Sequence, residues 1–270
     1  RLCAGRRAGV WRERVVYVEG GEDRILAAFR QRLAALGGET LAGRAVERVD
    51  ERAVAAEVRL SDGTIRSFDS VILTVPCSRI AALCPQLTEA EQTRLRSVVY
   101  QGIVCASVLM RHPLAEYYVP NITTEWVPFT AVIEMTTIVD RARFGGNSLV
   151  YLPRYLTQDD PFWAKSDTEI ASEFIGALER MYPRFRSEDV LSFQLSRVRE
   201  MLAVSTLEYS ERLLPPTRTS LPNVFIVNSA QIANGTLNVN ETVGLANAKA
   251  LELGALLGRA DAPALETSRS

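Results

Sequence analysis

The first third of the chain combines helical and strand spacing of apolar residues. Between positions 22 and 36 apolar residues recur every three or four positions, acidic residues occupy the first turn, and Gly37-Gly38 follows. This pattern predicts a helix with a defined end. Residues 54–60 alternate strictly between apolar and polar, and Asp62-Gly63 separates them from residues 64–68. That arrangement predicts an antiparallel hairpin.

Buried strands and a second, strand-rich unit are predicted farther along. The apolar run 71–75, closed by Pro76, is typical of a buried strand. From about Pro85 the pattern changes, and Thr88 is a candidate N-cap for a polar helix. Further strands are expected at 103–110, 130–137, 149–153, 190–198 and 224–227, and helices at 167–182 and 240–257. Residues 228–238 are predicted to form a loop.

Composition narrows the function classes. Hydrophobic residues make up 47% of the 270 residues and charged residues 23%, which is typical of a soluble globular protein. With a net charge of -1, no basic stripe indicates nucleic acid or an anionic membrane as a partner. The four cysteines show no zinc-like or disulfide-like spacing and are interpreted as free thiols. No apolar run is long enough to span a bilayer, so a cytoplasmic location is expected, although the first residue is Arg1 and an upstream targeting segment is compatible with it.

Three stretches carry a family resemblance. The helix, a Gly-Gly pair, Val46-x-x-Val49, the Asp-Gly hairpin and the run ending in Thr74-Val75-Pro76 resemble the middle of a flavin-containing amine oxidase. Residues 128–134 and 149–155 resemble the substrate side of protoporphyrinogen oxidase-like flavoproteins. The ending, 223–232 and then Asn240-Glu241-Thr242-Val243, is similar to the closing strand, loop and helix of that family.

This resemblance implies an α+β fold with FAD as the cofactor. It implies that residues 1–84 and 219–260 form an incomplete α/β-type FAD-binding domain, that residues 85–218 form a mixed-sheet substrate-binding domain with helices, and that 261–270 are a flexible tail. The cofactor-binding positions that it implies are Val46, through backbone contacts to adenine, and Thr74, Val75, Pro76, Asn228, Ser229, Asn240, Glu241, Thr242 and Val243. The start of the closing helix offers free N–H groups and a positive dipole end, which suit the pyrophosphate or a reduced flavin.

The sequence departs from the family pattern in two places. Asn228-Ser229 stand where the family commonly has Gly-Asp, so a neutral side chain replaces a carboxylate. No G-x-G-x-x-G motif occurs, and the ribose-binding acid that should follow it is missing too. We therefore expect the chain to be an N-terminally incomplete copy that holds half of a cofactor site.

Few side chains suggest catalysis, as expected where a flavin performs the difficult step. His112, the single histidine, has no visible triad partner and is interpreted as structural. Glu134 lies in an apolar run: pointing inward it would have a raised pKa or an arginine partner, and outward-facing alternation explains it equally well. Tyr151, Arg154 and Tyr155 are candidates for a pocket wall with one cation, and ordinary packing is the competing interpretation. No catalytic residue or metal site is named.

The function predicted from these features is an FAD-dependent oxidoreductase of the amine oxidase or protoporphyrinogen oxidase type, which transfers a hydride from a small organic substrate to the flavin. Two alternatives remain open. A flavin-dependent sugar mutase shares the fold and would need arginine pairs facing a nucleotide diphosphate. A non-catalytic binding module or remnant is favoured by the missing nucleotide-binding glycines.

Overall fold

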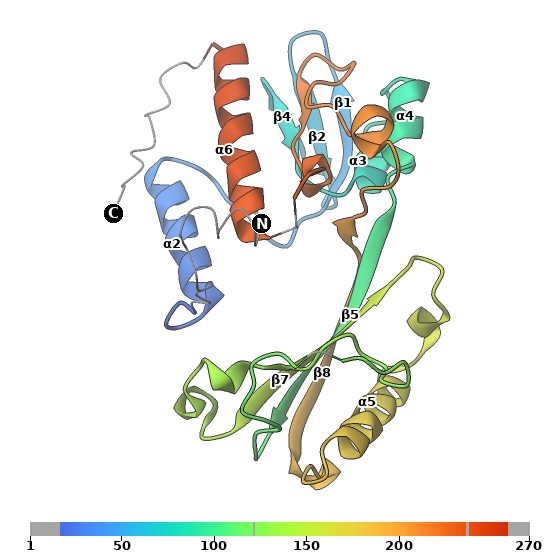
Figure 1. The fold of residues 1–270 in the computed structure, drawn as a ribbon. Helices are drawn as coiled ribbons and strands as arrows, with labels where there is room; N and C mark the ends of the chain where they lie inside the picture. Colours follow the sequence, from blue (N-terminus) through green and yellow to red (C-terminus); the bar gives the residue numbers. More distant parts are fainter. Residues whose placement is uncertain (1–16, 121, 236–237, 259–270) are drawn as a thin grey trace, which may run out of the picture.

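The computed structural model describes residues 17–120, 122–235 and 238–258, and two long strands connect its two lobes (Figure 1). One lobe contains helices α2 (Glu22–Ala35), α3 (Cys77–Leu83), α4 (Glu89–Arg96) and α6 (Val239–Leu256). The other contains helix α5 (Asp167–Met181). This mixture of helices with several sheets agrees with the predicted α+β class.

Two small sheets belong to the first lobe. Strands β1 (Val46–Glu51), β2 (Ala56–Leu60) and β3 (Ile65–Phe68) form an antiparallel sheet in the order β1-β2-β3, as the alternating pattern and the Asp62-Gly63 turn predict. Strand β4 (Val71–Leu73) pairs in parallel with β9 (Val224–Ile226), which follows it by about 150 positions in the sequence. The parallel pair therefore joins distant parts of the chain, and its two strands end at the same edge.

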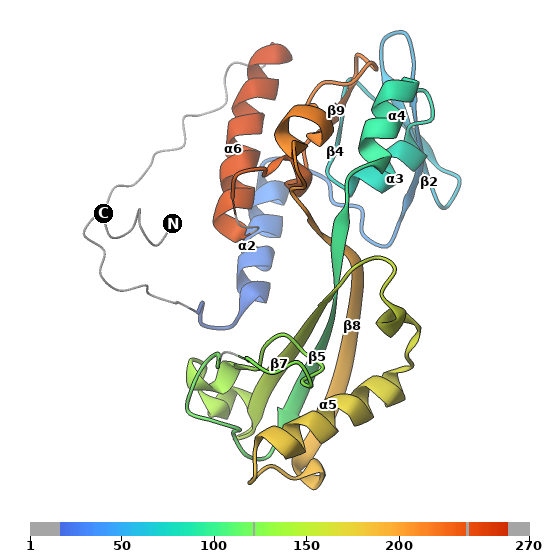
Figure 2. The ribbon, with the colours of Figure 1, turned by 45° about the vertical axis from the view of Figure 1, so that its right-hand side comes forward.

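A four-stranded antiparallel sheet, in the order β6-β7-β5-β8, dominates the second lobe. It consists of β5 (Tyr100–Met110), β6 (Ile133–Glu134), β7 (Ser148–Leu156) and β8 (Val190–Ala203). Burial alternates residue by residue along β5. Helix α5 runs along one face of this sheet (Figure 2), and its Ile170 and Phe174 pack against the buried members of β5 and β7.

The helices begin and end where the sequence signals lie. Thr88 and Ser166 form capping boxes with Glu91 and Glu169, so α4 and α5 each have two N-terminal donors satisfied. Short 3-10 helices occur at Met135–Thr137, Arg141–Phe144, Pro161–Ala164, Ser187–Asp189 and Ser229–Gln231, and one π-helical turn at Tyr209–Leu213.

Three element predictions need correction. The predicted strand 130–137 is wrong: only Ile133–Glu134 pair with β7, and a 3-10 turn follows directly. Helix α3 was not predicted, because seven residues are too few to show a helical period. Strand β5 begins at Tyr100, three residues before the predicted start.

Two separate hydrophobic cores underlie the lobes. The first core includes Leu95 of α4, Val98 and Tyr209 as well as the β1–β4 region. The predicted boundary near residue 84 stays a prediction, and this packing favours a boundary closer to residue 99. The predicted tail 261–270 lies outside the described residues.

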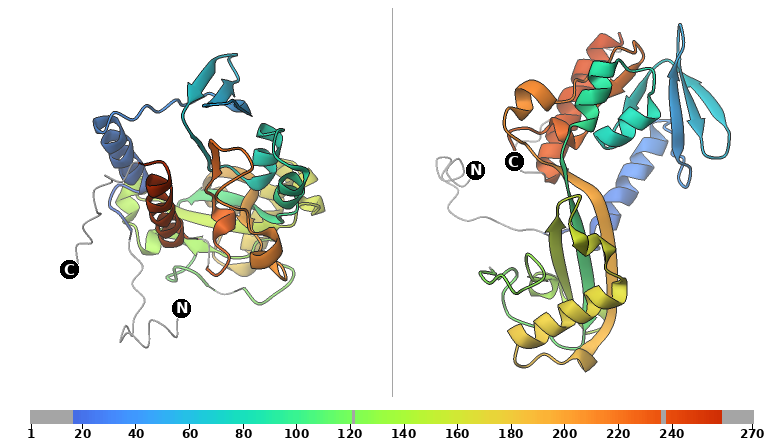
Figure 3. Two further views of the ribbon diagram at one scale, coloured as in Figure 1. Left: turned by 90° about the horizontal axis from the view of Figure 1, so that it is seen from above. Right: turned by 90° about the vertical axis from the view of Figure 1, so that its right-hand side faces the viewer.

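Helices α2 and α6 lie at the same side of the first lobe (Figures 1 and 3). No residue of α2 is buried, and Leu26 and Phe29 are 61% and 68% exposed. In α6 only Leu253 is buried. Within the described part of the chain, no helix is both long and apolar enough to cross a membrane.

Candidate functional site

The carboxyl ends of β4 and β9 define the candidate site. Because Leu73 pairs with Ile226 in parallel register, the segments 74–76 and 227–232 leave the sheet side by side. Open parallel sheets bind ligands at this edge. Thr74 and Val75, two predicted cofactor residues, are exposed there.

Asn228 connects these two segments. Its side chain is buried, its Nδ2 donates to the carbonyl oxygen of Val75 at 2.9 Å, and its Oδ1 accepts from the backbone N–H of Ala230 at 3.1 Å. Nδ2 also lies 3.6 Å from Sγ of Cys77. The amide is thus engaged inside the protein on both of its polar atoms. Asn228 holds the loop, and its neighbour Ser229 faces the open space.

A cavity of about 660 Å³ lies between these loops and the long sheet. Gln101 of β5 and Leu202 of β8, which are paired across the strands, form one wall, and Ser229 stands on the other. The remaining lining residues are Ala203, Val204, Ser205, Ile232, Ala233, Asn234 and Gly235. All of these side chains are uncharged, so the cavity can hold a partly apolar ring system and offers amide and hydroxyl groups to neutral polar atoms.

The first turn of α6 stands beside the cavity wall. Asn238 is its N-cap, with Oδ1 accepting from the backbone N–H of Glu241 at 3.0 Å, so the helix begins at Val239, one position before the predicted start. The predicted residues Asn240, Glu241, Thr242 and Val243 occupy this turn. A Cβ at Gly235 would lie 3.1 Å from the Glu241 carboxyl group. Glycine at position 235 therefore allows the cavity-lining segment to pass close to the start of α6.

Val46 lies at the start of β1, opposite Leu60, where a bulge shifts the register between Val46 and Arg48. Its side chain packs against the first core. The predicted backbone contact to adenine is compatible with a strand-end position and stays a prediction.

Glu134 points inward and is 1% exposed. Its carboxylate accepts from the backbone N–H of Leu114 at 3.1 Å and from the hydroxyl of Thr136. The carboxylate therefore anchors the loop at Leu114, 20 positions earlier in the sequence, rather than pairing with the arginine that an inward orientation suggested.

Tyr151, Arg154 and Tyr155 do not form one cluster. Tyr151 and Tyr155 are opposite Ser107 and Ile103 of β5, on the sheet face away from α5, whereas Arg154 is opposite the fully buried Val104. Side chains of a strand alternate between faces, so the predicted cation lies across the sheet from the two tyrosines. Burial raises the pKa of Tyr151, with smaller contributions from Cys105, Tyr17 and Glu22.

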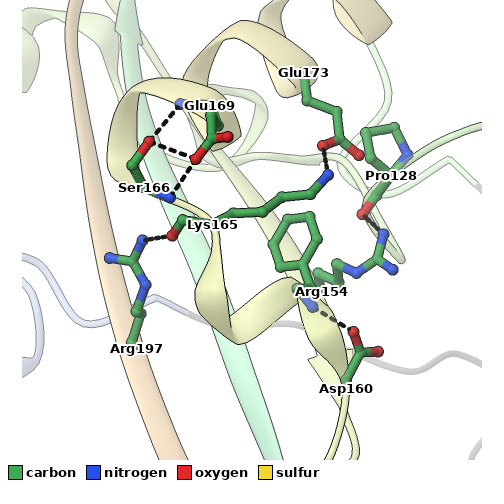
Figure 4. A network of polar contacts seen from close by, with 9 residues as sticks. Pro128, Arg154, Asp160, Lys165, Ser166, Glu169, Glu173 and Arg197 are labelled. Atoms are coloured by element: carbon green, nitrogen blue, oxygen red, sulfur yellow. Dashed lines mark hydrogen bonds and ion pairs between the residues drawn. The ribbon is translucent and has the colours of Figure 1, made fainter.

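Arg154 instead belongs to a packing network under α5 (Figure 4). Its guanidinium donates to the carbonyl oxygen of Pro128 at 2.8 Å and stacks 4.3 Å from the ring centre of Phe162. Lys165 approaches the same ring at 4.9 Å and pairs with Glu173. These contacts give Arg154 a structural role.

Gln101 and its neighbour Tyr100 were missed as site residues, because the predicted strand began at Ile103. The signal that could have found them is the tyrosine-glutamine pair directly before the apolar run. No group of three or more His, Cys, Asp or Glu side chains capable of holding a metal occurs among the described residues.

The chain matches one protein-family model and several solved structures. Residues 5–238 match the family model for flavin containing amine oxidoreductases. A protein from Exiguobacterium sp. 255-15 designated a protoporphyrinogen oxidase is 14% identical, with a TM-score of 0.69 over 86% of this chain and 51% of that one. An A394C mutant of putrescine oxidase is 18% identical, with a TM-score of 0.69 over 88% and 53%. Reduced UDP-galactopyranose mutase is 14% identical, with a TM-score of 0.63 over 87% and 52%.

The chain thus spans about half the length of the solved structures that it matches. No curated protein matches it by sequence. The structural likeness, at these identities, shows the fold, and the family model covers most of the chain. The chain belongs to the flavin containing amine oxidoreductase family.

Proposed function

We propose that this chain contributes to an FAD site in an oxidoreductase that takes a hydride from a small organic substrate. Family membership implies a flavin cofactor. The observation that carries the proposal is the uncharged cavity of about 660 Å³ at the carboxyl ends of β4 and β9, next to the start of α6.

The residues present fit such a cofactor. The first turn of α6 has backbone N–H groups and a positive dipole end, which favour an anionic oxygen. Thr74, Val75, Pro76 and Ser229 would contact the cofactor where the strands end. When bound, the flavin would supply the acceptor for the hydride.

The cavity lining has a separate task. Its apolar members exclude water, while Gln101 can donate to and accept from a substrate, and Ser205 and Ser229 offer hydroxyl groups. No acid or base is found among the described lining residues, which suits a reaction in which the chain orients the substrate without exchanging a proton. Tyr151 and Tyr155, on the open face of the same sheet, are proposed to extend the substrate surface.

The mutase alternative has less support. A nucleotide diphosphate calls for arginine near the cavity, and the described lining residues include none. The binding-module alternative rests on the missing glycine motif. The absorption experiment described below distinguishes it from an oxidoreductase.

We further propose that a nucleotide-binding segment covers α2 and completes the site. An amphipathic helix without tertiary packing is only marginally stable in water. The five large apolar side chains of the α2 region that remain exposed are Ile25, Leu26, Phe29, Leu33 and Leu36.

The test is a visible absorption spectrum of the purified chain with and without FAD, set beside a longer form extended at its N-terminus by a nucleotide-binding segment with a G-x-G-x-x-G motif. Flavin bands in the longer form support the proposal. Absence of flavin from both forms would favour the binding-module alternative.

A further inference from the structure

Tyr100 lies in the first core, directly before the cavity-lining residue Gln101. It is the first residue of β5 and is 6% exposed, and the next residue, Gln101, lines the cavity. Its carbonyl oxygen accepts from Nε2 of Gln158 at 2.9 Å, which fixes the backbone at this point. Burial strongly raises the pKa of its hydroxyl, so the group stays protonated.

The hydroxyl of Tyr100 reaches the opposite loop system. Its Oη accepts from the backbone N–H of Cys77 at 2.9 Å, in a buried position. Cys77 is the first residue of α3, where a backbone N–H has no partner within the helix. Tyr100 supplies the acceptor that this donor otherwise lacks.

From Cys77 the contacts continue to the segment 227–232, which follows β9. Sγ of Cys77 lies 3.6 Å from Nδ2 of Asn228, and Asn228 fixes Val75 on one side and Ala230 on the other. On the far side, Tyr209 donates its hydroxyl to the carbonyl oxygen of Ala230 at 2.7 Å. Ser229, between Asn228 and Ala230, is therefore held from both directions.

We propose that Tyr100 is a positioning residue that couples the sheet wall of the cavity, at Gln101, to the loop wall, at Ser229. The inference rests on the proposed function in one respect, namely that this cavity receives the flavin and its substrate. The coupling is carried by the hydroxyl group, because Tyr100→Phe would keep the ring in the first core and remove the contacts of the hydroxyl with Cys77.

The first test is hydrogen exchange of the purified chain, which needs no flavin. In Tyr100→Phe we expect faster exchange both in peptides that cover residues 74–84 and in peptides that cover 226–235. The control is Tyr117→Phe, whose side chain is 73% exposed. Faster exchange confined to 74–84 would overturn the coupling.

The second test uses FAD affinity and the midpoint potential of the bound flavin in Tyr100→Phe, Asn228→Ala and the double variant. In each single variant we expect FAD to bind roughly tenfold more weakly and the midpoint potential of the bound flavin to shift. The double variant should bind FAD no more weakly than the weaker-binding of the two single variants. Additive losses, or lowered thermal stability with unchanged affinity and potential, would overturn the positioning role. If neither the unsubstituted chain nor its longer form binds flavin, the proposed function fails, while the exchange result still decides the coupling.

Discussion

The side chain of Asn228 donates to the backbone carbonyl of Val75 at 2.9 Å, across 153 positions of sequence. This bond ties together the ends of two parallel strands whose connection passes through the whole second lobe. Asn228 therefore holds both segments with one side chain, because an amide can donate to Val75 and accept from the backbone N–H of Ala230 at the same time, which a carboxylate cannot do.

Asn228→Asp should destabilise the protein although the two side chains have nearly the same size and shape. The carboxylate cannot donate to Val75, and two acceptors would face one another in a buried position, at a cost of about 1–3 kcal/mol. Urea unfolding measures the difference. Asn247→Asp, at an exposed position of α6, is the matched control and should change stability by less than about 0.5 kcal/mol. Equal effects in both variants would contradict the assigned role.

The start of α6 gives a second prediction. Asn238→Ala removes the N-cap and should weaken FAD retention and lower stability by about 1 kcal/mol. Asn240→Pro should lower stability less than Asn238→Ala does, since residue 240 is in the first helical turn, where proline is tolerated. Flavin occupancy after gel filtration and thermal unfolding measure both effects. A larger loss in Asn240→Pro than in Asn238→Ala would be inconsistent with a helix that begins at Val239.

Replacement of two glycines by alanine should change the stability of the protein in opposite directions. At Gly102 a Cβ would lie 2.5 Å from the ring of Trp163 and 2.7 Å from the carbonyl oxygen of Arg199, so Gly102→Ala should cost about 1–3 kcal/mol. At Gly176, an exposed position of α5, a Cβ meets nothing within 4 Å, so Gly176→Ala should stabilise the protein by about 0.5–1 kcal/mol. Chemical denaturation distinguishes the signs, and destabilisation by Gly176→Ala would argue against the described helix.

Alkaline pH should weaken the fold. Burial raises the pKa of Cys84 from 9.0 to about 12 and that of Tyr209 from 10.0 to about 12. Both groups are neutral when protonated, so their contribution is fully present below pH 9 and is lost as the pH rises towards 12, where the unfolded chain ionises first. Unfolding free energies across this range should fall less steeply in Cys84→Ala than in the parent protein. An identical pH slope would contradict the buried thiol.

The sequence predicted the elements whose signals are local. The candidate cap Thr88, the Asp62-Gly63 turn and the alternation before it were enough to locate a helix and a hairpin. The strand around Glu134 was mispredicted, because an apolar run does not reveal that the chain turns into a 3-10 helix at Met135, directly after Glu134.

The site was less accessible to prediction. Which face of β7 carries Tyr151 and which carries Arg154 follows from alternation, but which face α5 covers depends on tertiary packing. Likewise, the link from Tyr100 through Cys77 to Asn228 joins residues that lie 23 and 151 positions apart, and no spacing in the sequence records it.

FAD titration of a cavity-filling variant tests the central claim most directly. Ala233→Trp introduces a bulky ring into the cavity wall, and Leu207→Trp places the same ring at a position that is 93% exposed. The chain and its longer form would each be titrated while the visible flavin bands are recorded. We predict saturable binding with shifted bands in the parent and Leu207→Trp proteins of at least the longer form, and loss of binding in Ala233→Trp. Equal binding in all three proteins, or no binding in either form, would contradict a flavin site at this cavity.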